Sequence, residues 1–187
     1  MSFMDDVVEL LQRSNCIKLG RFILSSGSES KIYIDLRALL SHPKEFKSLV
    51  KICDKIVEKM NFDILAGVES SGIPLATALA LEQEKPMIYV RKEAKDHGLR
   101  KRIEGDVQPG VKALVVDDVA TTGASLEGAV RALRSEGLTV SDAFVIVDRG
   151  EGAGERLAGL NVKLSSLITL NQITSRLKKS EKELEGG

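Results

Sequence analysis

Two adjacent carboxylates, Asp117 and Asp118, separate an apolar stretch from a turn of small and hydroxyl-bearing residues. The turn comprises Val119, Ala120, Thr121, Thr122, Gly123, Ala124 and Ser125. Residues 111–116 have the composition of a buried strand, and residues 126–135 have the apolar spacing of a helix. Backbone N–H groups in such a turn bind a phosphate dianion. Because carboxylates repel phosphate, the two acids suit the hydroxyls of a ribose. The pattern predicts a sugar-phosphate site at the carboxyl end of a parallel strand.

The alternative interpretation of this segment is an ordinary strand, turn and helix in which a Thr or Ser caps the helix. That arrangement requires no pair of aspartates before the turn, so the sugar-phosphate site accounts for more of the residues.

A second segment carries a local excess of positive charge. From Arg91 to Arg102 there are six basic side chains and two acidic ones. The segment falls in a polar loop that is predicted to extend to Gly110, and long loops in compact domains often close over a site. Basic side chains there can neutralise the charge that builds on a departing pyrophosphate. A solvated run of charge is the alternative, and the neighbouring site at Asp117 makes it less favourable.

A third segment repeats the order of an apolar strand followed by charge. Residues 144–147 are apolar, and Asp148 and Arg149 follow them. The Arg149 guanidinium can form two parallel hydrogen bonds with a planar carboxylate. A structural ion pair at the surface is the alternative interpretation.

Length and composition narrow the class of protein. The 187 residues suit a single domain, 1–187, with a full core. Because 27 basic side chains balance 27 acidic ones, we expect neither nucleic acid nor an anionic membrane as a partner. The sequence has no apolar stretch long enough to span a bilayer and no basic signal-peptide start, and Cys16 and Cys53 are isolated. We therefore expect a cytoplasmic protein.

The periodicity of the sequence predicts the elements that position these residues. Residues 1–40 are expected to form a small hood, or flap, with a helix at 4–13 and strands at 20–24 and 31–36. A helix begins at Pro43, and strands and helices alternate after it. The predicted strands are 62–68, 87–90, 111–116, 143–147 and 162–170, and the predicted helices between them are 72–81 and 126–135. This alternation predicts an α/β fold in which helices flank a parallel, twisted sheet. Residues 175–187 are a charged tail, either a solvated helix or frayed.

The segment from Leu114 to Ser125 resembles the phosphoribosyl-diphosphate (PRPP) signature of type I phosphoribosyltransferases. The resemblance implies the fold of that family. It also implies that Asp117 and Asp118 bind the ribose 2′- and 3′-hydroxyls, and that the turn ending at Ser125 binds the 5′-phosphate. The implied cofactor is Mg²⁺, held mainly by PRPP and water rather than by a dedicated set of protein ligands.

The residues that follow Val90 narrow the resemblance. Their sequence, Arg-Lys-Glu-Ala-Lys-Asp-His-Gly, is similar to the catalytic loop of orotate phosphoribosyltransferases. The resemblance implies diphosphate contacts from Arg91, Lys92, Lys95 and His97, the last two being catalytic together with the two aspartates. It further implies a homodimer in which the loop 91–105 is shared across the subunits.

Two matches concern the base. Tyr33 and Ile34 align with the residues that line the orotate ring in this family. Arg149, with Thr121, matches the pair that holds orotate.

Another match concerns the diphosphate. Ser70 and Ser71 fall in the segment that matches the family's diphosphate turn. Ser25 and Ser71 stand where many members have lysine, so diphosphate affinity is expected to depend more on other groups. These are Lys92, Lys95, Mg²⁺ and backbone N–H groups.

Taken together, the resemblance implies an enzyme, a pentosyltransferase. It converts orotate and PRPP into orotidine 5′-monophosphate and pyrophosphate in de novo pyrimidine (UMP) biosynthesis. Two alternatives stay open: a phosphoribosyltransferase for another base, and a non-enzymatic regulator of the same fold that senses PRPP. The zero net charge and the lack of a helix-turn-helix pattern before residue 20 disfavour the regulator.

Overall fold

The computed structural model of the chain describes residues 3–23, 29–93 and 102–185. Ser25, the turn predicted around it, and the loop residues Lys95 and His97 lie outside the described residues. The chain divides into two compact units, one formed by residues 1–49 and 175–187 and the other by residues 50–174.

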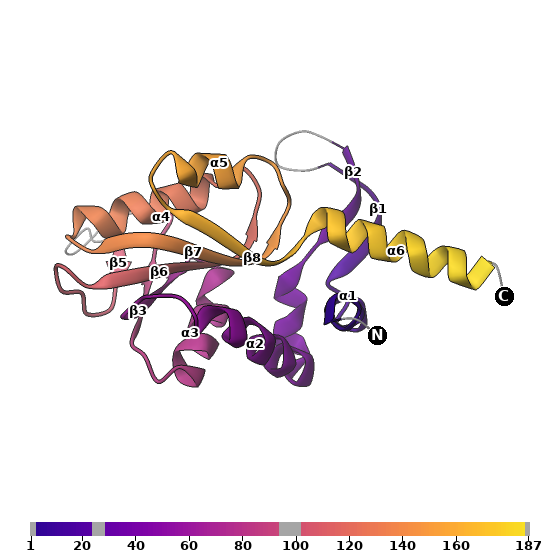
Figure 1. The fold of residues 1–187 in the computed structure, drawn as a ribbon, viewed down its shortest axis with the longest axis horizontal. Helices are drawn as coiled ribbons and strands as arrows, with labels where there is room; N and C mark the ends of the chain where they lie inside the picture. The colour runs from indigo at the N-terminus through magenta and orange to yellow at the C-terminus, as the bar shows by residue number, and fades with distance from the viewer. Residues whose placement is uncertain (1–2, 24–28, 94–101, 186–187) are drawn as a thin grey trace. The chain divides into compact units, whose positions relative to one another are not determined.

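A six-stranded sheet forms the centre of the larger unit, with its strands in the order β5-β4-β3-β6-β7-β8 (Figure 1). The strands are β3 (Ile64–Val68), β4 (Met87–Val90), β5 (Ile103–Glu104), β6 (Lys112–Ala120), β7 (Thr139–Asp148) and β8 (Lys163–Thr169). From β4 to β8 every neighbouring pair is parallel, and β5 is antiparallel to β4. The predicted α/β fold with a parallel sheet is confirmed.

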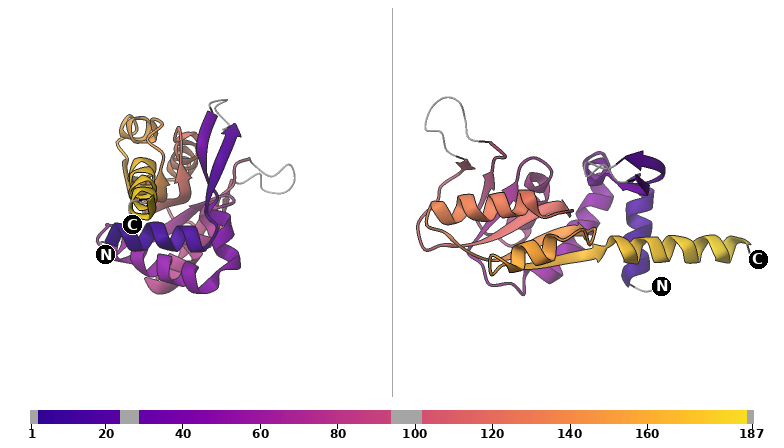
Figure 2. Two further views of the ribbon diagram at one scale, coloured as in Figure 1. Left: turned by 90° about the vertical axis from the view of Figure 1, so that its right-hand side faces the viewer. Right: turned by 90° about the horizontal axis from the view of Figure 1, so that it is seen from above.

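Helices cover both faces of this sheet (Figures 1 and 2). On one face lie α4 (Ala124–Ser135) and α5 (Ala153–Ala158), and on the other lies α3 (Gly72–Glu82). Side chains of β6 are therefore buried in both directions: Val115 belongs to the core beneath α4, and its neighbours Leu114 and Val116 are fully buried as well. This double burial explains why the strand is a continuous apolar run.

The smaller unit contains a helix, a hairpin and a 3₁₀ helix. These are α1 (Phe3–Arg13), the antiparallel strands β1 (Ile17–Ile23) and β2 (Glu29–Ile34), and η1 (Leu36–Ser41). The helix α2 (Pro43–Val57) begins in this unit at the predicted proline. The charged tail is helical and forms part of α6 (Leu170–Glu185), whose Arg176 pairs with Asp5 of α1 at 2.7 Å.

The structure corrects several predicted boundaries. The strand predicted to stop at residue 116 continues through both aspartates to Ala120, because its pairing with β7 persists as far as Asp148. The loop predicted up to Gly110 contains the short strand β5. In the hairpin, β1 begins at Ile17, and β2 ends at Ile34 because Leu36 turns into a 3₁₀ helix and is buried there.

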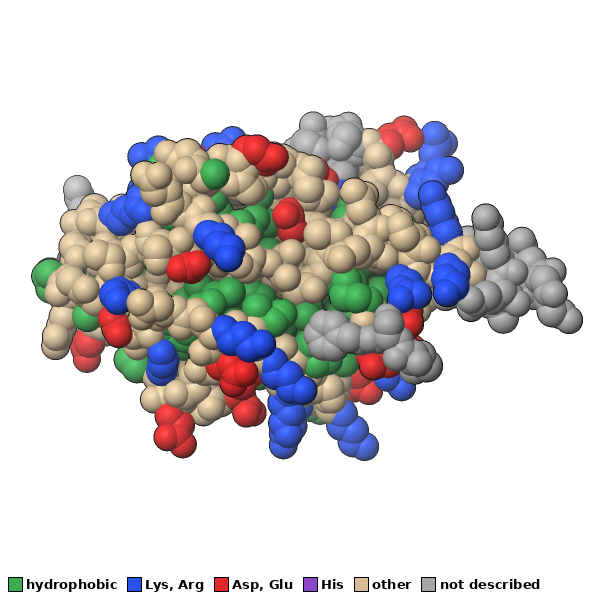
Figure 3. Space-filling model, viewed as in Figure 1, with side chains coloured by type: hydrophobic (Ala, Val, Ile, Leu, Met, Phe, Trp, Pro, Cys, Tyr) green, Lys and Arg blue, Asp and Glu red, His purple; other side chains and the backbone are tan. Residues whose placement is uncertain are grey.

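The surface carries side chains of both charges, as the balanced composition suggests. On the face drawn in Figure 3, basic and acidic side chains are interspersed. Within the described ranges, no helix has the length and apolar character needed to cross a membrane. Cys16 and Cys53 are free thiols and both are buried.

Candidate functional site

Asp117 and Asp118 occupy the carboxyl-terminal part of β6, at the edge where the parallel strands end. Asp117 is 8% exposed. The backbone N–H of Asp118 donates to Asp117 Oδ1 at 2.9 Å, and the backbone N–H of Val119 donates to Asp118 Oδ1 at 2.8 Å. Each carboxylate is therefore held at one oxygen by the following amide, which fixes both acids relative to the strand.

A glycine brings a second predicted segment next to these acids. Gly72, the first residue of α3, lies so close to β6 that a Cβ there would be 2.4 Å from the Val116 carbonyl oxygen and 3.1 Å from Asp117 Oδ1. Only glycine permits this approach. The loop that carries Ser70 and Ser71 immediately precedes Gly72, and its Glu69–Ser70 peptide bond is cis. The predicted diphosphate turn and the predicted ribose acids thus lie together.

The electrostatic environment favours the protonated form of one acid. Burial raises the pKa of Asp117 well above its usual range, and the neighbouring negative charge of Asp118 raises it further. The positive charge of Lys92 acts in the opposite direction. Lys92 is therefore close enough to Asp117 for the two charges to interact.

The turn after β6 forms a small hollow at the start of α4. The hollow has a volume of about 50 Å³ and is lined by Asp117, Val119, Ala120, Thr121, Thr122, Gly123, Ala124, Ser125 and Leu126. Gly123 precedes the helix with φ of 78° and has no side chain that could cap it. The first N–H groups of α4 therefore receive no cap from this residue and face the turn, the arrangement that the sequence predicts for phosphate binding.

A brace from α5, which sequence reasoning missed, supports this turn from behind. Arg156 Nε donates to the Thr122 carbonyl oxygen at 2.7 Å, and its Nη1 lies 2.7 Å from Glu127 Oε2 in the first turn of α4. A Cβ on Gly123 would be 2.9 Å from Ala153 Cα, so α5 also packs directly against the turn. Arg156 lies 34 positions from Thr122, and no local pattern points to the contact.

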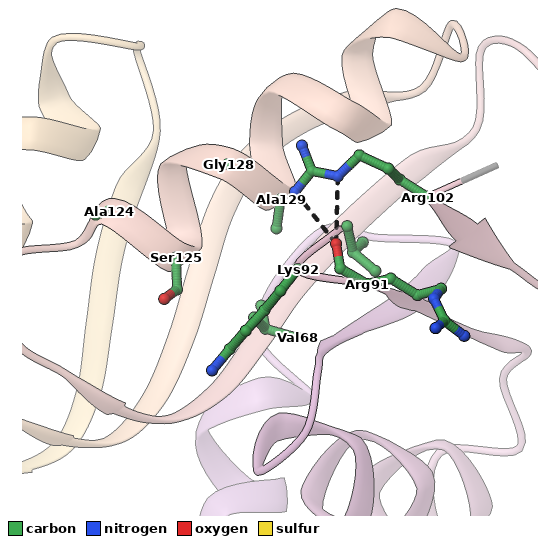
Figure 4. A pocket seen from close by; sticks show the side chains of 9 residues that line it. Val68, Arg91, Lys92, Arg102, Ala124, Ser125, Gly128 and Ala129 are labelled. Carbon is green, nitrogen blue, oxygen red and sulfur yellow. Dashed lines mark hydrogen bonds between the residues drawn. The ribbon is translucent and has the colours of Figure 1, made fainter. Parts of the chain in front are cut away.

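A larger pocket adjoins the hollow and shares Ala124 and Ser125 with it (Figure 4). It has a volume of about 250 Å³ and is lined by Val68, Val90, Arg91, Lys92, Arg102, Ala124, Ser125, Gly128 and Ala129. In Figure 4 the Lys92 side chain extends across the pocket toward Ser125. The positive charge of Lys92 beside a phosphate-type turn makes this a suitable place for a polyanion.

Arg91 also lines the pocket, but its side chain does not extend across it as that of Lys92 does. Its side chain runs in another direction (Figure 4), and its Nη1 lies 3.7 Å from Glu104 Oε1 of β5. The buried Nε of Arg91 has no hydrogen-bond partner among the described residues. The two adjacent basic residues that the sequence groups together therefore point to different places.

Arg149 lies at the end of β7, next to the turn. Its backbone N–H donates to the Ala120 carbonyl oxygen at 3.0 Å, which places it beside Thr121. Its side chain is 6% exposed, and Nε donates to Glu151 Oε1 at 2.7 Å. Glu151 was missed, although its place two residues after an arginine was a signal for an ion pair. The pair occupies Nε of the guanidinium, and the terminal nitrogens have no hydrogen-bond partner in the described ranges.

The remaining predicted residues of the base site, Tyr33 and Ile34, are described within their own unit. Tyr33 and Ile34 belong to the smaller unit, where the Tyr33 ring lies 5.4 Å from the Phe22 ring and Ile34 is buried. In the described part of the chain, no three His, Cys, Asp or Glu side chains gather to hold a metal ion.

Comparison with known proteins extends over nearly the whole chain. The model of the phosphoribosyl transferase domain family matches residues 35–166. The orotate phosphoribosyltransferase of Pyrococcus horikoshii is 42% identical over 175 residues, which cover 92% of this chain and 94% of the relative.

Solved structures agree with the sequence comparison. The crystal structure of orotate phosphoribosyltransferase from Aeropyrum pernix matches with a TM-score of 0.86 and 41% identity, covering 92% of this chain and 98% of that one. The structure of Leishmania donovani UMP synthase matches with a TM-score of 0.87 and 33% identity, covering 96% of this chain but 39% of the larger protein.

Proposed function

Since this chain belongs to the orotate phosphoribosyltransferase family, we propose that the site at the end of β6 transfers the phosphoribosyl group of PRPP to orotate. The products are orotidine 5′-monophosphate and pyrophosphate, and the reaction is a step of pyrimidine biosynthesis. The observation that carries the assignment is the continuous unit formed by Asp117, Asp118, the turn and the start of α4.

The ribose phosphate is held by this unit. The carboxylates of Asp117 and Asp118 accept hydrogen bonds from the ribose hydroxyls, and the neighbouring backbone amides keep both acids in place. The 5′-phosphate fits the hollow, where N–H groups of the turn, the hydroxyls of Thr121, Thr122 and Ser125, and the start of α4 donate to it. Fixing the sugar at both ends positions the anomeric carbon for attack.

The diphosphate extends toward the larger pocket. Lys92 and the Ser70–Ser71 loop supply donors there, and Lys95 and His97 are proposed to cover the leaving pyrophosphate. Since Ser71 brings no charge, Lys92 carries more of the electrostatic stabilisation than it does in relatives with a lysine in the loop. Arg91 needs to turn from Glu104 to contribute to the same site.

Orotate is oriented by Arg149 and Thr121. The bond from Nε to Glu151 fixes the plane of the guanidinium, so that its terminal N–H groups can pair with the orotate carboxylate. This aims the pyrimidine nitrogen at the anomeric carbon, and no covalent enzyme intermediate is required. Tyr33 and Ile34 are proposed to line the ring.

Mg²⁺ is the proposed cofactor. The two adjacent carboxylates are too few to enclose the ion, and they suit a hard cation that takes its other ligands from substrate oxygens and water. When bound, Mg²⁺ neutralises part of the diphosphate charge.

We further propose a cytoplasmic homodimer without nucleic-acid or membrane partners, in which the loop 91–105 is shared across the subunits. Lys92 serves the pocket of its own subunit, and Lys95 and His97 serve the neighbouring site. Mixing inactive Lys95→Ala and Asp117→Asn subunits tests the sharing. Recovery of activity is expected, because one site of a mixed dimer then has neither defect, and no recovery would contradict it.

The first experiment is the loss of orotate absorbance with purified protein, PRPP and Mg²⁺. We expect orotate consumption that requires every component and disappears in the Asp117→Asn/Asp118→Asn double variant. Consumption of another base, or PRPP binding without any reaction, would instead support one of the alternatives.

A further inference from the structure

The peptide group that joins Arg91 to Lys92 is held at both of its polar ends. Its carbonyl oxygen accepts hydrogen bonds from Arg102 Nε at 3.3 Å and Arg102 Nη2 at 3.2 Å (Figure 4). Its N–H, on the Lys92 side, donates to Glu69 Oε2 at 3.0 Å. One peptide plane is therefore fixed by a guanidinium on one side and by a carboxylate on the other.

The surrounding backbone strengthens this arrangement. The Arg91 N–H donates to the Arg102 carbonyl oxygen at 2.7 Å, just beyond the last β4–β5 pair, Val90 with Ile103. The Glu69 N–H donates to the Val90 carbonyl oxygen at 2.9 Å. Residues 69, 91 and 102 thus connect the loop after β3, the end of β4 and the start of β5. Among their side chains, the charged guanidinium of Arg102 is the strongest hydrogen-bond donor.

Arg102 reaches this position by lying against α4. A Cβ on Gly128 would be 3.6 Å from Arg102 Nη2, so the guanidinium lies over the helix at its glycine. This distance is an ordinary van der Waals contact, so the guanidinium packs on the surface of the helix at this position. The side chain is thereby confined between α4 and the Arg91 carbonyl group.

The consequence concerns the side chain of Lys92. The orientation of the peptide plane before a residue helps to set the direction in which its side chain leaves the backbone. With the 91–92 peptide fixed, the Lys92 side chain extends across the pocket toward Ser125. Without the Arg102 fork, the carbonyl group loses both side-chain donors and only the Glu69 bond still holds the peptide plane, so Lys92 is directed less firmly toward the pocket.

We propose that Arg102 is a positioning residue, which directs Lys92 toward the diphosphate by fixing the 91–92 peptide plane. The inference rests on the proposed function, in which Lys92 binds the diphosphate. Arg102 acts through Lys92 and makes no contact of its own with the substrate.

The test is calorimetric binding of two probes, pyrophosphate with Mg²⁺ and ribose 5-phosphate, to four proteins: wild type, Arg102→Ala, Lys92→Ala and the double variant. Arg102→Ala should weaken pyrophosphate binding about tenfold, as expected for loss of charged hydrogen bonds, and leave ribose 5-phosphate binding unchanged. In the Lys92→Ala background the same change should have no further effect on pyrophosphate.

The matched control is Arg131→Ala, which removes an arginine whose side chain is 64% exposed on α4 and should leave both affinities unchanged. A full Arg102 effect that persists in the Lys92→Ala background would mean direct contact with the diphosphate and would overturn the proposal. Equal weakening of both probes, with a lower melting temperature, would also overturn it by showing a general structural role. Wild-type protein that binds neither probe would instead reject the proposed function.

Discussion

The two halves of the proposed PRPP site are built in different ways. The side proposed to receive the 5′-phosphate is one continuous segment, from β6 through the turn into α4. The side proposed to receive the diphosphate is assembled from the 69–71 loop, the end of β4 and the residue before β5. The partners of the 91–92 peptide lie 11 and 23 positions away along the chain.

This difference has a functional meaning. A turn bounded by a strand and a helix has its donors in place before the substrate arrives, which suits the part of the substrate that does not react. A group held by long-range hydrogen bonds can be adjusted as charge develops on the leaving group. The 5′-phosphate is therefore proposed to be anchored by one local element, whereas the diphosphate, at the reacting end of the substrate, is proposed to be bound by several segments.

Asp117 lies between the two halves, and its replacement should have the largest effect. Asp117→Asn should lower kcat/KM for PRPP by about 100-fold or more, because one carboxyl oxygen accepts from the Asp118 N–H and the other is replaced by an NH₂ group, which cannot accept from a ribose hydroxyl. The same substitution should lower activity but raise the stability of the folded protein at high pH. The raised pKa means that the folded protein binds this proton more tightly than the unfolded chain, so stability declines as pH rises above the ordinary aspartate range, toward the raised pKa.

Melting temperatures of the wild type and Asp117→Asn, measured from acid to alkaline pH, test this sign. The variant should gain on the wild type as pH increases and should be the more stable protein above the raised pKa. A difference that does not change with pH would contradict the assignment.

The second prediction concerns the anchoring half alone. Gly123→Ala places a side chain at φ of 78° and a Cβ 2.9 Å from Ala153 Cα, so the turn must shift. We expect a loss of about 2 kcal/mol in unfolding free energy and about tenfold weaker binding of ribose 5-phosphate. Denaturant unfolding and calorimetry measure the two effects.

Gly154→Ala is the matched control, because a Cβ there meets no atom within 4 Å. It should retain wild-type affinity and stability, or gain slightly from the higher helix propensity of alanine. Wild-type affinity in Gly123→Ala as well would mean that the shape of the turn does not matter for the phosphate.

The same difference explains what the sequence revealed. Strand, acids, turn and helix follow one another from residue 111 to 135, so local composition sufficed to predict the anchoring half and the sheet around it. The end of β6 was placed too early because two aspartates suggest exposure, whereas the pairing of Asp117 with Val145 keeps the strand intact.

Contacts between distant segments could not be predicted in this way. Nothing near Arg102 indicates that it would reach the Arg91 carbonyl group, and nothing near Arg156 indicates the contact with Thr122. Adjacent basic residues were grouped by charge, yet the backbone sends Arg91 toward Glu104 and Lys92 toward the pocket. The number of charged residues was enough to predict a site for a polyanion. The direction of each side chain could not be predicted, because it depends on which backbone groups are held by distant residues.

The smallest predicted effect comes from removing the brace behind the turn. Arg156 is 44% exposed, so solvent screens its pairing with Glu127, and its bond to the Thr122 carbonyl oxygen is the more valuable contact. Arg156→Ala should weaken ribose 5-phosphate binding about threefold, the cost of one exposed hydrogen bond, and leave pyrophosphate binding unchanged. Arg102→Ala should show the reverse selectivity.

The double variant Arg102→Ala/Arg156→Ala tests whether the two halves are independent. If they are, it should show both single effects at full size, because the effects of separate sites add in free energy. A double variant that loses much more affinity for either probe than the corresponding single variant would show that the brace and the Arg102 fork are coupled, and that the anchor and the reacting end form one cooperative unit.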